Sequence, residues 1–222
     1  DNLVVKTDDG NVAFTYPLDT ALSNEVESLE FDGFNFWTLE NAGTQIIFRR
    51  WQIQNYVCTL QNTFIKNDDG SHNYDSDAFT VEHYHFQFSA PETIGQTTLS
   101  VDDPEAIVAD ISTKVSSGNT VRLGPSSASG HEGEWEEFSV VSAAAGSINV
   151  SPGITHNYEA GDPIHVYKYI WAFNNYNGVA SEGALYKFDA YTGSFITKFG
   201  GNEYDNITAC TFAVIEEGLT NK

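Results

Sequence analysis

The chain has 222 residues, of which 41% are hydrophobic and 14% aromatic, and its formal net charge is −21. The hydrophobic and aromatic content excludes wholesale disorder. The length is enough for one large domain, or for one domain that carries an inserted one. Because 31 Asp and Glu residues face only 10 Lys and Arg residues, phosphate groups would repel the chain. We therefore expect neither nucleic acid nor membrane as a partner.

The first third of the chain has the pattern of short antiparallel strands joined by tight turns. Apolar and polar residues alternate over 12–16 and 26–31, and aromatic residues recur over 34–39. Asp32-Gly33 and Asn41-Ala42-Gly43 are turn sequences, because Gly adopts positive φ and Asp or Asn bonds to turn amides. The pattern predicts a meander of strands up to about residue 63.

Residues 63–77 form the most polar stretch and are predicted to be a loop. Four of its side chains offer hard oxygen donors that suit Ca²⁺, namely Asp68, Asp69, Asp75 and Asp77. The stretch lacks the acid spacing and the twelfth-position Glu of an EF-hand loop, so that family is excluded. A looser calcium site and a plain acidic surface turn both remain open. We expect no cofactor, with Ca²⁺ at this loop as the alternative.

Residues 79–88 alternate as a long strand that places His83 and His85 on one face. Two imidazoles at this spacing bind a metal ion if a third ligand approaches them. No third ligand stands at a recognisable spacing in the sequence, so a packed or solvated pair is the favoured interpretation.

Short β runs bounded by Gly, Pro or Asp follow one another from residue 94 to residue 167. They are Thr97-Thr98-Leu99-Ser100-Val101, then Val121-Arg122-Leu123-Gly124, then a run over 136–141, and last Gly161-Asp162-Pro163-Ile164. In this order the runs resemble a β-barrel-like module of phage tail, fibre and other virion proteins, which also occurs in bacterial surface proteins. The resemblance implies a structural role on a particle surface.

One departure from that module lies between Asp103 and Gly118. Asp103 followed by Pro104 is a helix start, and Ile107, Ile111 and Val115 recur at helical spacing with Val108. We expect one short helix here and no other in the chain.

Two stretches resemble blades of a β-propeller. Residues 26–53 contain a strand that ends in Asp32-Gly33 and a following strand with Trp37, and residues 184–199 contain Asp189 and Thr192-Gly193 in a hairpin. In the second hairpin Asp189 is expected to accept turn amide protons while Gly193 takes positive φ. A closed propeller needs four or more blades, so it does not fit this chain.

Two further clusters were weighed as sites. Residues 131–137 gather four carboxylates around Trp135, and a charged loop leading into a strand explains them better than a glycosidase pair held across a cleft. Trp171, Phe173, Asn175 and Tyr176 form an aromatic and amide cluster able to stack on sugar rings and bind their hydroxyls. The alternative for the second cluster is a strand end with a polar turn.

Sulfur-containing residues are few. Cys58 and Cys210 lie in apolar runs far apart in the sequence, and a disulfide and two buried thiols are both open. Met is absent, even at position 1, so we expect a processed chain or part of a longer protein.

Together these patterns predict an all-β fold with at most one short helix. Residues 1–90 and 170–222 would form an antiparallel β-sandwich or barrel-like unit, into which a small β-barrel-like module, 91–169, is inserted. We expect a non-enzymatic virion structural or surface protein, located at a virion surface or outside the cell, with copies of itself and other virion proteins as partners. The alternatives are a carbohydrate-binding adhesin domain that recognises a host-surface glycan and, third, a glycan hydrolase.

Overall fold

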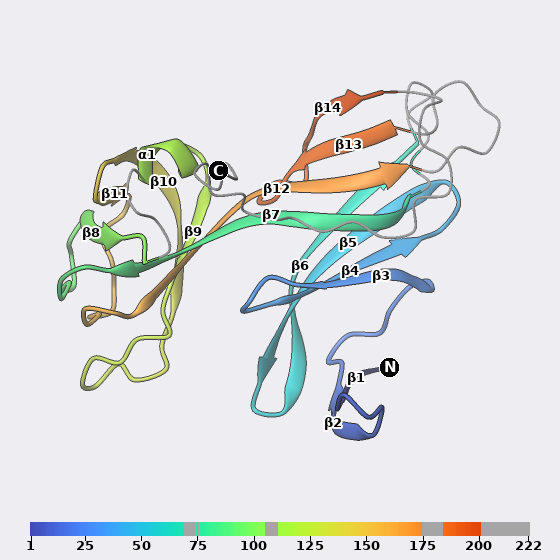
Figure 1. The fold of residues 1–222 in the computed structure, drawn as a ribbon, viewed down its shortest axis with the longest axis horizontal. Helices are drawn as coiled ribbons and strands as arrows, with labels where there is room; N and C mark the ends of the chain where they lie inside the picture. Colours follow the sequence, from blue (N-terminus) through green and yellow to red (C-terminus); the bar gives the residue numbers. More distant parts are fainter. Residues whose placement is uncertain (69–73, 75, 105–110, 175–183, 201–222) are drawn as a thin grey trace, which may run out of the picture. The chain divides into compact units, whose positions relative to one another are not determined.

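The computed structural model describes residues 1–68, 74, 76–104, 111–174 and 184–200, without the side chains of residues 77 and 174. The described chain is nearly all β, as the sequence predicts, and it divides into two compact units. One unit contains Asp1–Val81 with 170–200, and the other contains Glu82–Tyr169. Two long strands, β7 (Ser76–Phe88) and β12 (Pro163–Asn174), each contribute to both units (Figure 1).

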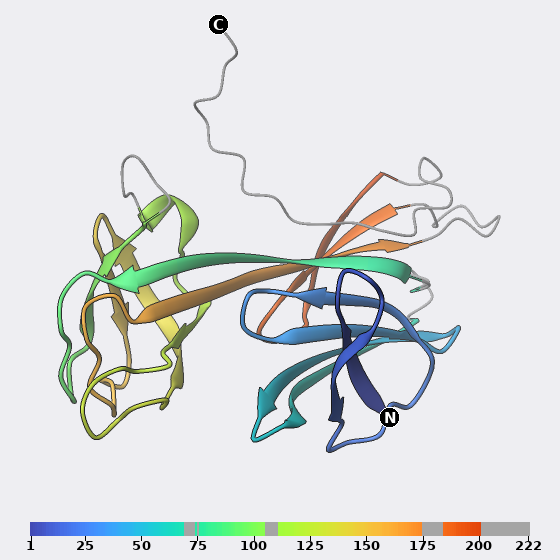
Figure 2. The same ribbon diagram turned by 60° about the horizontal axis from the view of Figure 1, so that its bottom comes forward.

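The first unit contains two facing sheets. β3 (Val26–Phe31), β4 (Phe36–Asn41), β5 (Gln45–Gln54) and β6 (Val57–Asn67) pair in chain order as the predicted antiparallel meander. β13 (Ala184–Asp189) and β14 (Phe195–Phe199) extend the sheet that β7 and β12 begin. Figure 2 shows β13 and β14, in orange and red, above the blue and cyan meander.

Aromatic side chains fill the space between these two sheets. The Phe48 ring on β5 lies 5.7 Å from that of Phe79 on β7 and 5.6 Å from that of Phe188 on β13, measured between centroids. All three side chains are buried. Tilted ring pairs at this distance combine apolar burial with a favourable quadrupole arrangement. Because the rings come from both sheets, the two sheets pack face to face as a β-sandwich.

The second unit is a closed six-stranded barrel. Its order is β12, β7, β8 (Thr98–Asp102), β11 (Ser147–Val150), β10 (Glu136–Ala144) and β9 (Thr120–Leu123), and β9 pairs back to β12. Closure leaves the barrel without an edge strand. Apolar residues from all six strands form one buried core inside it.

The predicted helix appears as a single turn, α1 (Ile111–Lys114). Ile111 and Val115 join the barrel core, as their helical spacing suggested, whereas Ile107 and Val108 lie outside the described residues. In the part of the chain that the structure describes, no helix is long and apolar enough to cross a membrane.

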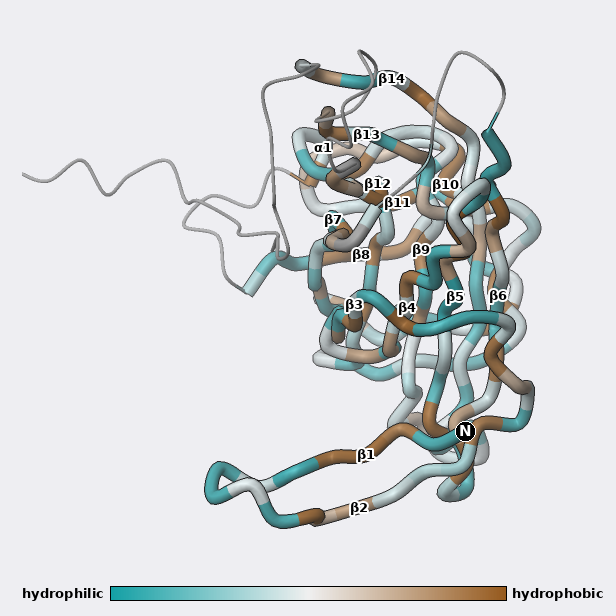
Figure 3. Tube along the Cα trace, turned by 90° about the vertical axis from the view of Figure 1, so that its right-hand side faces the viewer, coloured by the Kyte–Doolittle hydropathy of each residue, from teal (hydrophilic) through white to brown (hydrophobic). Residues whose placement is uncertain are grey.

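A separate hairpin precedes the sandwich. β1 (Asn2–Lys6) and β2 (Val12–Pro17) pair with each other as a two-stranded sheet of their own. Figure 3 shows this hairpin standing out from the strands of its unit, with hydrophobic stretches coloured brown. We call it the β1–β2 arm.

Candidate functional site

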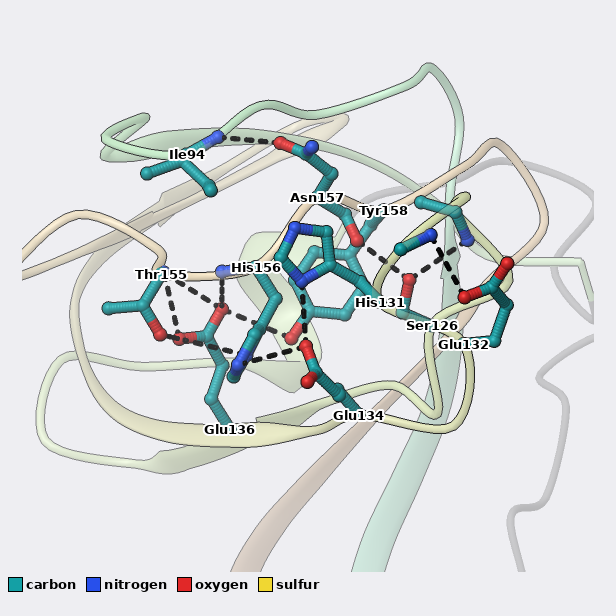
Figure 4. A network of polar contacts seen from close by, with 12 residues as sticks. Ile94, Ser126, His131, Glu132, Glu134, Glu136, Thr155, His156, Asn157 and Tyr158 are labelled. Atoms are coloured by element: carbon teal, nitrogen blue, oxygen red, sulfur yellow. Dashed lines mark hydrogen bonds and ion pairs between the residues drawn. The ribbon is translucent and has the colours of Figure 1, made fainter.

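Three potential metal ligands converge on one side of the barrel unit. His131 and Glu134 belong to the loop between β9 and β10, and His156 belongs to the loop between β11 and β12. The Glu134 carboxylate lies between the two imidazoles: its Oε2 is 2.6 Å from His131 Nδ1 and 3.2 Å from His156 Nε2 (Figure 4). The three ligand atoms lie within 4.8 Å of one another. We call this group the His–Glu–His cluster.

Short-range hydrogen bonds shape the loop that holds His131 and Glu134. The amide of Ser126 donates to the Glu134 carbonyl at 2.8 Å, and that of Glu134 donates to the His131 carbonyl at 3.0 Å. Glu132 turns back to accept the amide of Gly130 at 2.9 Å. Because these bonds are internal to the loop, they hold its two candidate ligands on the same side.

The loop is also anchored to β9. Gly124 has a φ of 99°, and a Cβ at that position would lie 2.6 Å from the Glu134 carbonyl oxygen. Only glycine therefore permits this close approach. Trp135, the residue after Glu134, also contacts β9. Its ring centroid lies 3.6 Å from Cζ of the buried Arg122 guanidinium.

Glu136, the first residue of β10, holds the loop that contains His156. Its carboxylate accepts the Thr155 amide at 2.9 Å, the Thr155 hydroxyl at 2.7 Å and the Tyr158 hydroxyl at 3.1 Å. Burial, followed by the charge of Glu136, raises the pKa of Tyr158 above its ordinary range, so its hydroxyl stays protonated. Glu136 Oε2 also lies 3.8 Å from Nδ1 of His156, on the far side of that ring from Glu134 (Figure 4).

The sequence indicated only part of this cluster. Residues 131–137 are a loop that leads into β10 at Glu136, in agreement with the predicted charged loop. Nothing in the sequence points to His156, because it lies 25 positions from His131 and local spacing carries no signal of their approach.

His83 and His85 lie close to a third histidine, His165, which the sequence pattern did not indicate. Their ring centroids are 5.0 Å apart, and the ring of His165 on β12 lies 4.7 Å from that of His85 at 80°. Within the described residues, three possible ligand atoms come within 4.8 Å of one another in the His–Glu–His cluster but not in this row of imidazoles.

The calcium prediction stays a prediction. Asp69 and Asp75 lie outside the described residues, as does the side chain of Asp77. Asp68 Oδ1 accepts the backbone amide of Tyr74 at 2.8 Å, which is the behaviour of a loop-closing carboxylate.

The proposed aromatic cluster is described in part. Trp171 and Phe173 lie on β12 and are half-buried, while Asn175 and Tyr176 lie outside the described residues. The Trp171 ring lies 5.8 Å from that of Phe199 on β14, and the ammonium group of Lys187 sits 4.7 Å from its centroid. The neighbouring strands therefore hold the indole in a fixed position.

A groove of about 650 Å³ runs along the β1–β2 arm. Its walls are mainly apolar and include Leu3 and Leu18 on one side and Leu29, Phe36 and Trp51 on the sandwich. Cys58, a buried thiol, also lines it, and burial raises the pKa of Cys58 to about 11. Cys210 lies outside the described residues.

Comparison with known proteins adds no identification. No protein-family model, curated protein or solved structure matches the chain.

Proposed function

We propose that this chain is a non-enzymatic structural protein that assembles in many copies through its β-strands, at the surface of a virion. The main support for assembly through strands is the exposed apolar face of the β1–β2 arm. The virion setting is supported by the order of β runs in residues 94–167, which resembles the module of phage tail and fibre proteins.

One face of the arm is apolar and is not buried. Leu3 pairs with Tyr16 and Val5 with Phe14, so these four side chains share one face of the two-stranded ribbon. Phe14 is 57% exposed, and the other three are only half-buried. A two-stranded hairpin is marginal by itself in water, so a face of this kind favours a partner that covers it.

The charge distribution points to a second copy as that partner. The chain has 31 Asp and Glu residues, yet the strands of the arm contain none. Apart from Lys6 these strands are uncharged, and scarce charge together with exposed aromatic residues is typical of the core of a protein interface. On β3, an edge strand of the four-stranded sheet, Leu29 and Phe31 are also exposed, and Leu29 lines the groove. The arm of one copy would therefore find an apolar surface on the next.

Sedimentation equilibrium tests this function. We expect the wild-type chain to form oligomers at micromolar concentration, and Phe14→Ser to shift the distribution to monomer. Tyr56→Asn is the matched control, because Tyr56 is another exposed aromatic residue, 81% accessible, in the turn between β5 and β6. A wild-type chain that stays monomeric, or one that dissociates equally with either substitution, contradicts the proposal. Capsid or tail genes beside the coding sequence are expected if the virion setting is correct.

The second candidate function is a carbohydrate-binding adhesin domain, favoured by the aromatic pair of Trp171 and Phe199. Phe199 is 49% exposed beside the half-buried indole, and exposed aromatic faces stack on sugar rings. A glycan array read with the wild-type chain and with Trp171→Ala decides this point. Binding by a monomeric chain that Trp171→Ala abolishes favours the adhesin over the structural protein.

A further inference from the structure

We propose that the His–Glu–His cluster binds one Zn²⁺ ion, which ties the loop 124–135 to the loop 151–162 of the barrel unit. This site lies in a different unit from the β1–β2 arm, so it goes beyond the proposed assembly function. Two imidazole nitrogens and one carboxylate oxygen form a ligand set that zinc takes, with a fourth position open to water.

Two of the three distances between donor atoms are close to those that the ion requires. Zinc bonds of about 2.0–2.1 Å in tetrahedral geometry place donor atoms about 3.3 Å apart. His156 Nε2 and Glu134 Oε2 are 3.2 Å apart and already meet this spacing. His131 Nδ1 and Glu134 Oε2 are 2.6 Å apart, a hydrogen-bond distance, so the binding of zinc requires these two atoms to separate by less than about 1 Å.

The orientation of the rings also fits. The ring centroids of His131 and His156 are 5.4 Å apart and their planes are inclined by 63°. Two imidazoles bound to one tetrahedral zinc ion have their centroids about 5 Å apart, because each ring extends outward from a bond of about 2 Å. The two rings therefore already lie at about the separation that a shared ion requires.

A carboxylate stands behind one of the ligands. Histidine ligands of zinc commonly donate their second nitrogen to a carboxylate, which orients the ring. His156 Nδ1 is buried, has no hydrogen-bond partner within the described residues, and lies 3.8 Å from Glu136 Oε2. Zinc at Nε2 would place the proton of His156 on Nδ1, which faces the Glu136 carboxylate.

The site is accessible from solvent. The side chains of His131 and His156 are 21% and 25% exposed, and that of Glu134 is 47% exposed. An ion can therefore enter without opening the barrel. Since the two loops are far apart in the sequence, the ion would act as a cross-link between them.

Isothermal titration of the chelator-treated chain with ZnCl₂ tests the site. We expect one zinc ion per chain at a site that His131→Gln, His156→Gln and Glu134→Gln each weaken by more than about 100-fold, and that Glu136→Gln weakens by roughly 10-fold, as loss of an outer carboxylate does. Two matched controls leave the affinity unchanged: Glu159→Gln, at an exposed position of the loop 151–162 and not a ligand, and His83→Gln on β7. Circular dichroism confirms that each variant is folded.

Hydrogen exchange supplies a second measurement. If the three side chains only pair with one another and bind no ion, adding zinc would leave the exchange rates unchanged. Zinc is expected to slow exchange at amides of both loops and nowhere else in the barrel. Absence of binding, weak binding that the ligand variants leave unchanged, or binding that His83→Gln abolishes would each overturn the proposal. The last result would place the ion at the row of His83, His85 and His165.

Discussion

The indole Nε1 of Trp37 donates a 2.7 Å hydrogen bond to Oδ2 of Asp32. The other carboxylate oxygen, Oδ1, accepts the backbone amides of Phe34 and Asn35 at 2.8 and 2.6 Å. Asp32 is only 1% exposed, so one buried carboxylate both closes the turn from β3 to β4 and fixes a core tryptophan. This contact couples the turn sequence directly to the packing of the sandwich.

Asp32→Ala is expected to lower the free energy of unfolding by about 3 kcal/mol. Hydrogen bonds to a charged group contribute about 1.5–3 kcal/mol each, and the substitution removes the three that Asp32 accepts from the indole N–H and two amides. Urea unfolding followed by tryptophan fluorescence measures the change.

Asp9→Ala is the control for that substitution. Asp9 also closes a turn, accepting the side chains of Thr7 and Asn11, but it is fully exposed at the tip of the β1–β2 arm. We expect no comparable loss of stability, because water replaces its hydrogen bonds. Equal losses in the two variants would mean that burial of Asp32 is not the cause.

Gly193→Ala is expected to destabilise the sandwich by about 2–4 kcal/mol. Gly193 has a φ of 65°, which costs other residues about 1–2 kcal/mol, and an added Cβ would lie 2.7 Å from the Phe64 side chain. The midpoint of thermal or urea unfolding measures the loss.

Gly43→Ala separates the two causes. Gly43 has a similar φ of 78° in the turn between β4 and β5, but nothing lies within 4 Å of an added Cβ. Its substitution is therefore expected to cost only the backbone part. If both variants lose the same stability, the contact with Phe64 is not responsible.

Glu30→Gln is expected to stabilise the chain at neutral pH. Burial raises the pKa of Glu30 above its ordinary value of 4.5, while the Thr80 hydroxyl donates to it at 2.8 Å and opposes that shift. A raised folded-state pKa gives stability that is present below pH 4.5 and is lost as pH rises through the folded value. The amide keeps the acceptor for Thr80 and removes the charge.

Urea midpoints at pH 7, 6 and 5 measure this effect. The advantage of Glu30→Gln over the wild type is expected to shrink as pH falls, because the wild-type carboxyl takes up its proton. Glu25→Gln, at an exposed position, is the control and should follow the wild type at each pH. A constant difference across this range would rule out ionisation as its cause.

Local chemistry made much of the fold predictable. The hairpin after β13 is an example: Asp189 Oδ1 accepts the amides of Tyr191 and Thr192, and Gly193 takes positive φ, as expected from Asp189 and Thr192-Gly193. The same holds for the turn at Asp32-Gly33 and for the all-β character, because each depends on alternation and turn residues within a few positions.

Contacts between distant segments were not predictable in this way. The alternation of 79–88 predicts a strand but carries no sign that β7 passes from the sandwich into the barrel. His156 is the single histidine of the loop 151–162, and only the closing of the barrel brings it to Glu134. Candidate sites built from several loops therefore require the structure.

Self-association through the β1–β2 arm is expected to strengthen with salt. Each copy carries a formal net charge of −21, so copies repel one another over distances that salt shortens, from a Debye length of about 30 Å at 0.01 M to about 8 Å at 0.15 M. The strands of the arm contain no carboxylate, hence screening removes repulsion without breaking ion pairs within the contact. Sedimentation at 0.01, 0.15 and 0.5 M NaCl measures the dissociation constant, with Phe14→Ser as the variant that should stay monomeric throughout. Dissociation on adding salt would instead indicate that ion pairs hold the copies together, and the apolar face of Phe14 and Val5 would then not be the interface.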